Sequence, residues 1–129
     1  MRSAKPLRKA LAYPKFVIRM VAGKPNRESR SFEGVKERYF EKLTQGGSAS
    51  GKFIPPPVSH SQKEKLLAAY MREGDRMAAN IRKRWNEQSL DKYLLPHPLL
   101  GKVTVREMMF FTVFHTDHHD KIIHRDLKS

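Results

Sequence analysis

The chain contains no cysteine among its 129 residues. Disulfide bonds and thiolate metal sites are therefore excluded, and a metal site would have to be built from histidine and carboxylate side chains. No apolar run is long enough to span a bilayer, and the N-terminus lacks the apolar segment of a secretory signal. These absences are consistent with a reduced, cytoplasmic setting and no membrane span.

Acidic residues are scarce: 13 Asp and Glu stand against 26 Lys and Arg, for a formal net charge of +13. The basic residues between positions 2 and 30 are Arg2, Lys5, Arg8, Lys9, Lys15, Arg19, Lys24, Arg27 and Arg30, against one acid, Glu28. Such a segment attracts phosphates on nucleic acid or on an anionic surface. No DNA-binding motif or aromatic platform accompanies the charge, so a nucleic-acid partner is not favoured and a solvated basic face is the simpler interpretation.

The length is that of one domain, 1–129, and four segments in it have helical periodicity. They span about 5–21, 32–43, 61–85 and 104–123, with a long loop at 45–60 and a connection at 87–103 before the last helix. Pro14 lies inside the first segment and predicts a kink or break there. No alternating strand pattern is evident. The expected architecture is therefore all-α, an antiparallel up-down four-helix bundle.

Two of the helices have predicted capping boxes at their N-termini, Ser61 with Glu64 and Thr104 with Glu107. The helix after Ser61 carries a long apolar stripe. Its members are Leu66, Leu67, Tyr70, Met71, Met77, Ala78, Ile81 and Trp85. At this helical spacing they are most simply core residues.

The last helical segment carries His115 and His119 four residues apart, so both imidazoles lie on one face. The expected buried face contains Met108, Phe111, Thr112, His115, His119 and Ile122. Two neutral imidazoles at this spacing suit one divalent transition metal, such as zinc, nickel or iron. A hydrogen-bonded or partly exposed pair without metal is the alternative that the spacing leaves open.

A catalytic metal site normally has a third protein ligand. The remaining histidines are His60, His97, His118 and His124. His118 points about a quarter-turn away from His119 on the helix. Asp117 and Asp120 are candidates to hydrogen-bond a ligating ring and fix its tautomer.

The segment from His97 to Ile123 resembles the C-terminal signature of the DinB-like superfamily of metal-dependent proteins. The shared elements are the turn His97-Pro98-Leu99-Leu100-Gly101, the capped start Thr104 with Glu107, and His115 with His118 and His119. The resemblance implies a four-helix bundle that holds a divalent metal through three histidines, with His115 and His119 as the last-helix ligands. Characterised relatives include transferases and isomerases that use low-molecular-weight thiols such as bacillithiol or mycothiol, where the metal activates the thiolate.

In that family the remaining ligand lies on an early helix, whereas this chain has no histidine before His60. The resemblance thus implies a bundle that lacks its N-terminal part, or that has lost or replaced the ligand. Missing helices would expose apolar surface, so a homodimer is expected.

The main hypothesis is a divalent-metal-binding protein that acts on a small electrophilic substrate as a thiol-dependent S-transferase or a hydrolase. The alternatives are a catalytically inactive bundle, or a basic binding module for nucleic acid or anionic surfaces.

Overall fold

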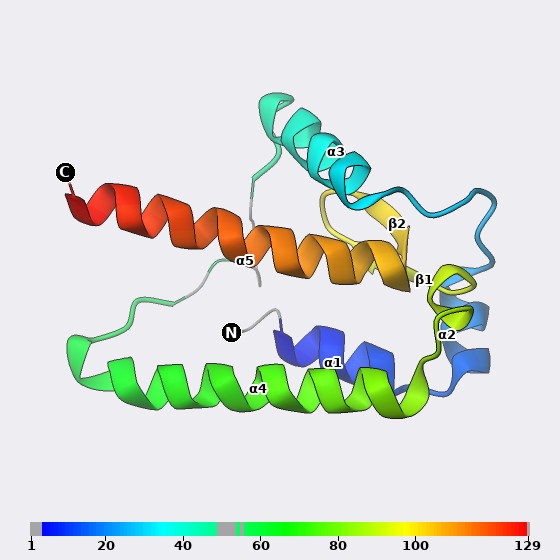
Figure 1. Ribbon diagram of the computed structural model, residues 1–129, viewed down its shortest axis with the longest axis horizontal. Helices are drawn as coiled ribbons and strands as arrows, with labels where there is room; N and C mark the ends of the chain where they lie inside the picture. Colours follow the sequence, from blue (N-terminus) through cyan, green and yellow to red (C-terminus); the bar gives the residue numbers. More distant parts are fainter. Residues whose placement is uncertain (1–3, 49–53, 55, 129) are drawn as a thin grey trace.

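The computed structural model of the chain describes residues 4–48, 54 and 56–128. They are mostly helical and include one small sheet (Figure 1). The helices are α1 (Ala4–Ala12), α2 (Lys15–Ala22), α3 (Phe32–Thr44), α4 (Lys63–Arg84) and α5 (Val105–Lys128), with 3₁₀ turns η2 (His60–Gln62) and η3 (Ser89–Asp91). The strands are β1 (Leu94–His97) and β2 (Gly101–Thr104). The predicted helical class is confirmed, while the simple up-down order of four helices is not.

The first predicted helix is divided at Pro14, as its sequence indicated. α1 ends at Ala12 and α2 begins at Lys15. The Pro14 ring cannot continue a helix, but its carbonyl oxygen accepts the N–H groups of Val17 at 3.0 Å and Ile18 at 3.2 Å, which starts the next one. The two halves therefore pack on different partners, α1 on α4 and α2 on β1.

α3 confirms the helix predicted at 32–43 and packs against α5. Ser31 caps it, since its Oγ accepts the Gly34 N–H at 3.1 Å. Val35 and Tyr39, one turn apart on the same side of the helix, are buried. The long loop predicted at 45–60 lies partly outside the described residues.

A β-hairpin occupies the connection at 87–103, where no strand was predicted. β1 and β2 pair antiparallel, with Leu94 opposite Thr104 and His97 opposite Gly101. Strands of four residues are too short to display a clear alternating pattern in the sequence. Gly101 has a φ of +75°, a left-handed conformation that favours glycine at the end of the turn.

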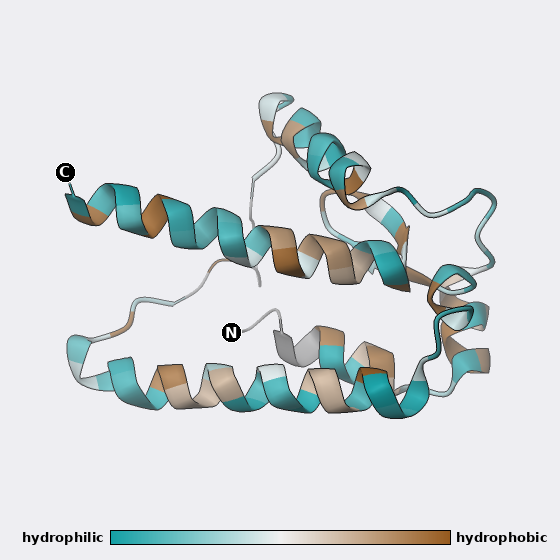
Figure 2. Ribbon diagram, in the orientation of Figure 1, coloured by the Kyte–Doolittle hydropathy of each residue, from teal (hydrophilic) through white to brown (hydrophobic). Residues whose placement is uncertain are grey.

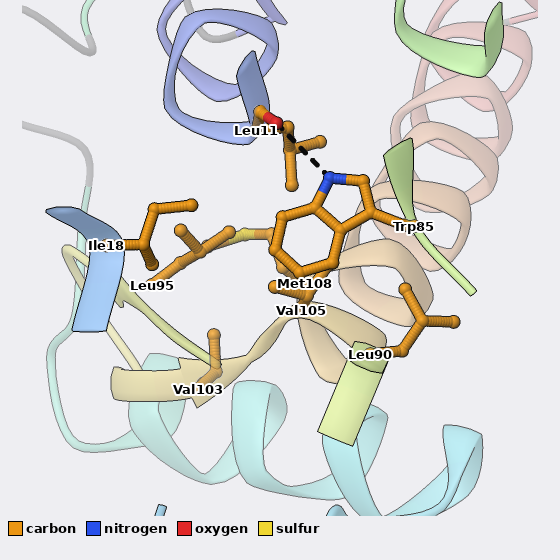
Figure 3. Packing of buried hydrophobic residues seen from close by; sticks show 8 residues of the cluster. All are labelled: Leu11, Ile18, Trp85, Leu90, Leu95, Val103, Val105 and Met108. Carbon is orange, nitrogen blue, oxygen red and sulfur yellow. Dashed lines mark hydrogen bonds between the residues drawn. The ribbon is translucent and has the colours of Figure 1, made fainter. Parts of the chain in front are cut away.

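The hydrophobic core lies where α1, α2, the hairpin, the end of α4 and the start of α5 meet (Figure 3). Its buried members are Leu11, Ile18, Trp85, Leu90, Leu95, Val103, Val105 and Met108. The Trp85 indole N–H donates to the Leu11 carbonyl oxygen at 3.2 Å, so the buried ring keeps a polar partner.

The start of α4 differs from its prediction in two respects. The capping box is formed by Ser59 and Gln62, not by Ser61 and Glu64. Leu67, Tyr70 and Met71 are 58%, 44% and 58% exposed, so the prediction that they are core residues is wrong. In Figure 1 the first turns of α4 and the last turns of α5 extend past α1 and α3.

The two ends of α5 differ in character. Its N-terminal half is largely hydrophobic and its C-terminal half largely hydrophilic (Figure 2). Of the helices in the described ranges, none is both long and apolar enough to cross a membrane.

Candidate metal centre

The start of α5 is fixed by the predicted capping box of Thr104 and Glu107. The Glu107 N–H donates to Thr104 Oγ1 at 3.2 Å, and the Thr104 N–H donates to Glu107 Oε2 at 2.7 Å. Glu107 has no exposed surface. The capping box therefore fixes the residue at which α5 begins. The start of the helix in turn decides to which side of α5 the histidines further along it point.

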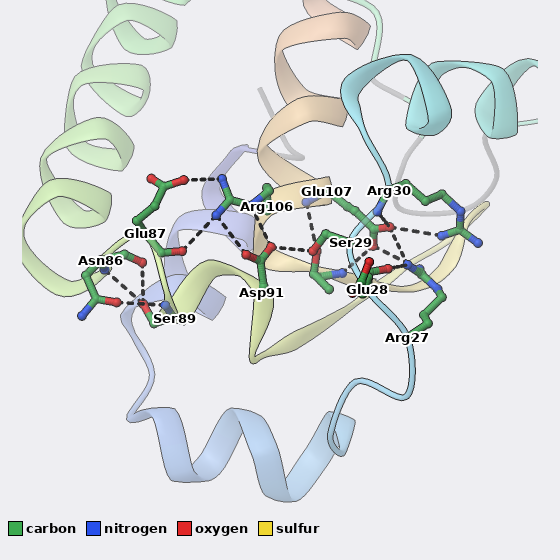
Figure 4. Close-up of polar contacts among 11 residues, drawn as sticks. Arg27, Glu28, Ser29, Arg30, Asn86, Glu87, Ser89, Asp91, Arg106 and Glu107 are labelled. Atoms are coloured by element: carbon green, nitrogen blue, oxygen red, sulfur yellow. Dashed lines mark hydrogen bonds and ion pairs between the residues drawn. The ribbon is translucent and has the colours of Figure 1, made fainter.

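Glu107 also binds two arginines of the loop before α3 (Figure 4). Arg27 donates to both carboxylate oxygens, at 2.7 and 3.1 Å, and the Arg30 N–H donates to Oε1 at 2.9 Å. Burial acts to raise the pKa of Glu107, but the hydrogen bonds from Arg27, Arg30 and Thr104 outweigh it and lower the pKa. The ionised carboxylate thus ties this loop to α5.

Sequence reasoning missed this role of Arg27 and Arg30. Both were counted as part of a solvated basic segment, and their partner is 80 and 77 positions away. The one local signal was an acid, Glu107, at the predicted start of a helix in a strongly basic chain. The contact matters for the site because the same loop leads into α3, which packs beside the histidines.

His115 and His119 converge, as predicted. Their Nε2 atoms are 3.0 Å apart, and the rings are nearly perpendicular at 89°. The ring that carries a proton on Nε2 is the hydrogen-bond donor, and the Nε2 lone pair of the other ring accepts. A tetrahedral metal with bonds of about 2.0–2.1 Å would hold two nitrogens about 3.3 Å apart. To become two ligands of one ion, the nitrogens would move a few tenths of an ångström apart, the proton between them would leave Nε2 for an Nδ1 atom, and both rings would turn their lone pairs toward the metal.

The two rings have different surroundings. His115 is half-buried, stacked on Phe111 at 4.8 Å between ring centroids and edge-on to Tyr39 at 5.7 Å. Burial, and then the charges of His119 and His118, lower the pKa of His115 to about 4. It is neutral at pH 7, which is the metal-binding form. His119 is exposed, so the prediction that both rings face the core is right for His115 and wrong for His119.

His118 is turned toward α3. Its ring stacks on Phe114 at 5.8 Å between centroids and meets Phe40 edge-on at 5.6 Å. It lies 5.6 Å from the His119 ring but does not share the convergence point of the pair. The aromatic contacts of α3 hold it there.

His97 approaches the pair from the hairpin turn but has a structural role. Its Nδ1 accepts the N–H groups of Leu99 at 3.1 Å and Leu100 at 3.0 Å, which closes the turn. Burial, and then the charge of His115, lower its pKa to about 4. In the neutral ring the proton is then on Nε2, so no lone pair is left for a metal. His97 is therefore not the third ligand in this arrangement.

The other candidate groups lie elsewhere. His60 is exposed in η2. His124 pairs with Asp120, with Nδ1 3.3 Å from the carboxylate, and Asp117 binds Lys121 at 2.7 Å. Neither acid orients a ring of the pair. Across the residues that the structure describes, no group of three or more His, Cys, Asp or Glu is arranged to hold a metal. The two residues predicted as ligands lie together, and among the described residues no third group joins them.

Comparison with known proteins adds no relative: no protein-family model, curated protein or solved structure matches this chain. The DinB-like assignment therefore rests on the residues from His97 to Ile123 and stays a prediction.

Proposed function

We propose that this chain is a divalent-metal-binding protein of the DinB-like kind, in which His115 and His119 hold one zinc, nickel or iron ion. The observation that carries the proposal is the 3.0 Å distance between their Nε2 atoms. The low pKa of His115 supports it, because no proton has to be removed from that ring at neutral pH.

The environment of the pair suits a reaction on a small molecule. Phe111 and Tyr39 hold the His115 ring in place and shield one side from water. His119 is exposed, so a substrate reaches the pair from solvent. A bound ion with two protein ligands would leave positions at which a low-molecular-weight thiol, or water, becomes a nucleophile at neutral pH.

The proposed activity is thus thiol-dependent S-transfer, or hydrolysis, on a small electrophilic substrate. A low-molecular-weight thiol cosubstrate and a chain without cysteine both fit a reducing setting, so we place the protein in the cytoplasm. The alternative within the same fold is a bundle without activity, in which the pair is only a hydrogen bond.

We also propose that the protein is a homodimer and that each chain forms an incomplete four-helix bundle. An apolar cavity of about 140 Å³ is lined by residues of α1, α4 and α5, among them Leu7, Met77 and Val113. Four exposed apolar side chains of α4 and α5 would form the open face of this incomplete bundle. They are Leu67, Tyr70, Met71 and Val113, each between 44% and 65% exposed. Covering it with a second copy would remove apolar surface from water.

The direct test is elemental analysis of the purified, untagged protein after incubation with zinc or nickel. Near-stoichiometric metal in the parent and none in His115→Ala or His119→Ala is the expected result. His124→Ala, an exposed histidine on the same helix, is the matched control and should keep its metal. A parent protein without metal, or unchanged metal in both variants, would refute the proposal.

A further inference from the structure

The solvent-facing side of α2 is apolar, whereas the exposed side of a surface helix is normally polar or charged. Ile18 and Ala22 are buried against the body of the protein, at 6% and 5% exposed. On the other side of the helix, Phe16, Met20 and Val21 are 69%, 76% and 76% exposed. Tyr13, just before the helix, is 57% exposed. Together Tyr13, Phe16, Met20 and Val21 form what we call the α2 face.

The charged residues of α2 are turned away from this face. The Lys15 ammonium lies 5.0 Å from the centroid of the Trp85 ring, and the Arg19 guanidinium lies 4.6 Å from that of Tyr93. Arg19 also donates to the Lys92 carbonyl oxygen at 3.2 Å. A surface helix normally places charge outward and apolar residues inward, whereas α2 has apolar residues on both sides and charge along its flank.

The rim of the α2 face is positively charged. Arg84 reaches it from the end of α4 and donates to the Tyr13 carbonyl oxygen at 3.2 Å. At the other end, Lys102 donates to the Ala22 carbonyl oxygen at 2.8 Å. A hollow of about 320 Å³ opens there, and Lys24 and Lys102 are among the residues that line it. An apolar centre with cations around it is the pattern of a surface that enters the headgroup region of a membrane.

We propose that the α2 face docks on an anionic lipid bilayer, with Phe16, Met20 and Val21 at the acyl boundary and the basic rim among the headgroups. This inference is independent of the metal site. A second copy is a poor occupant, because docking two such faces would bring like-charged rims together in a chain of net charge +13. Nucleic acid is also a poor occupant, since the exposed centre of the face is apolar and its cations lie only at the rim, while Lys15 and Arg19 are held at aromatic rings.

The test is flotation of the full chain with vesicles of phosphatidylcholine alone, and of phosphatidylcholine with about one third phosphatidylglycerol. The wild type should float with the anionic vesicles at low salt, much less at high salt, and hardly at all with the neutral ones. The double variant Phe16→Ser/Met20→Gln should bind the anionic vesicles about tenfold less tightly. Leu127→Gln, at an 81% exposed position of α5, is the matched control and should bind like the wild type.

Circular dichroism should show all three proteins equally folded, because every substituted side chain is exposed. As a second readout, Phe16→Trp should give a blue shift of emission with anionic vesicles, above the constant signal of Trp85. Absence of flotation by folded wild type, or equal flotation of the double variant, would overturn the proposal. The proposal would also be overturned if the wild type bound DNA, or formed a dimer, at concentrations where it does not bind vesicles, and if the double variant abolished that binding. The α2 face would then be the binding site of another partner.

Discussion

Arg27 and Glu107, 80 positions apart in the chain, form a two-pronged ion pair in which each carboxylate oxygen accepts one guanidinium N–H. Glu107 is fully buried, whereas the Arg27 side chain is one-third exposed. Such a pair stabilises little relative to apolar residues of the same shape, but it is costly to break because the buried charge is left without its partner.

Replacement of Arg27 by alanine should lower the free energy of unfolding by about 2–4 kcal/mol, somewhat below the full cost of breaking a buried pair because Arg30 still donates to Glu107. Urea denaturation measures this change. Arg38→Ala, which removes the exposed pair with Glu41, is the control and should cost less than about 1 kcal/mol. Equal, small losses in both variants would mean that Glu107 does not depend on Arg27.

Stability should fall as the pH is lowered from 6.5 toward 5. The pKa values of His97 and His115 are about 4 in the folded protein, below the ordinary 6.5. The unfolded chain therefore binds more protons in this window, and acidification favours it. The limit is about 1.4 kcal/mol per pH unit for each histidine.

Urea titrations between pH 7 and 5 test this dependence, above the range in which Glu107 and Asp91, whose pKa values are lowered, take up protons. His115→Gln should reduce the slope of stability against pH, while Leu127→Gln, at an 81% exposed position without a titratable group, should leave it unchanged. A flat profile for the wild type would show that neither His97 nor His115 is held neutral by the fold.

Zinc should stabilise the wild type. A ligand that binds only the folded state at one hundred times its Kd adds about 2.7 kcal/mol to the free energy of unfolding. Differential scanning calorimetry with and without zinc should therefore give a higher Tm with the metal, and His119→Ala should abolish the rise. Because His119 is exposed, this variant should keep the Tm of the metal-free wild type. An equal rise in Tm for the wild type and His119→Ala would mean that zinc binds at a site other than the histidine pair.

The proposed dimer should dissociate when charge is placed on the open face. Leu67→Glu combined with Met71→Glu changes two exposed side chains on adjacent turns of α4, so the fold should survive. Analytical ultracentrifugation should find a dimer for the wild type and a monomer for this variant. Met20→Gln tests whether the α2 face contributes to the dimer interface, and this variant should remain dimeric. A monomeric wild type at micromolar concentration would contradict the dimer.

Features that depend on nearby residues could be predicted from the sequence. Pro14 divides a helix by its own geometry, and Thr104 with Glu107 caps α5 within four residues. The convergence of His115 and His119 follows from helical spacing alone. Even local signals can compete, however: Ser59 with Gln62 offers the same cap as Ser61 with Glu64, two residues earlier, and it is the one that forms.

Features that depend on distant partners could not be predicted. Tyr70 and Met71 follow the periodicity of a buried stripe, yet α1 lies along only the later part of α4 (Figure 1), so they stay exposed. The inward positions of Lys15 and Arg19 require the rings of Trp85 and Tyr93, which the sequence places about seventy residues away. Likewise, no local pattern indicates that the Nδ1 atom of His97 accepts hydrogen bonds from backbone N–H groups of its own turn.

The chain has a single tryptophan, Trp85, and its indole N–H is bonded to the last turn of α1. Its fluorescence therefore reports one event, the separation of α1 from the end of α4 and the core beneath them. If α1 detaches before the other helices melt, the emission should shift to the red while the circular dichroism signal is still nearly intact. A built-in optical probe thus separates loss of the N-terminal helix from unfolding of α5, which carries the histidines.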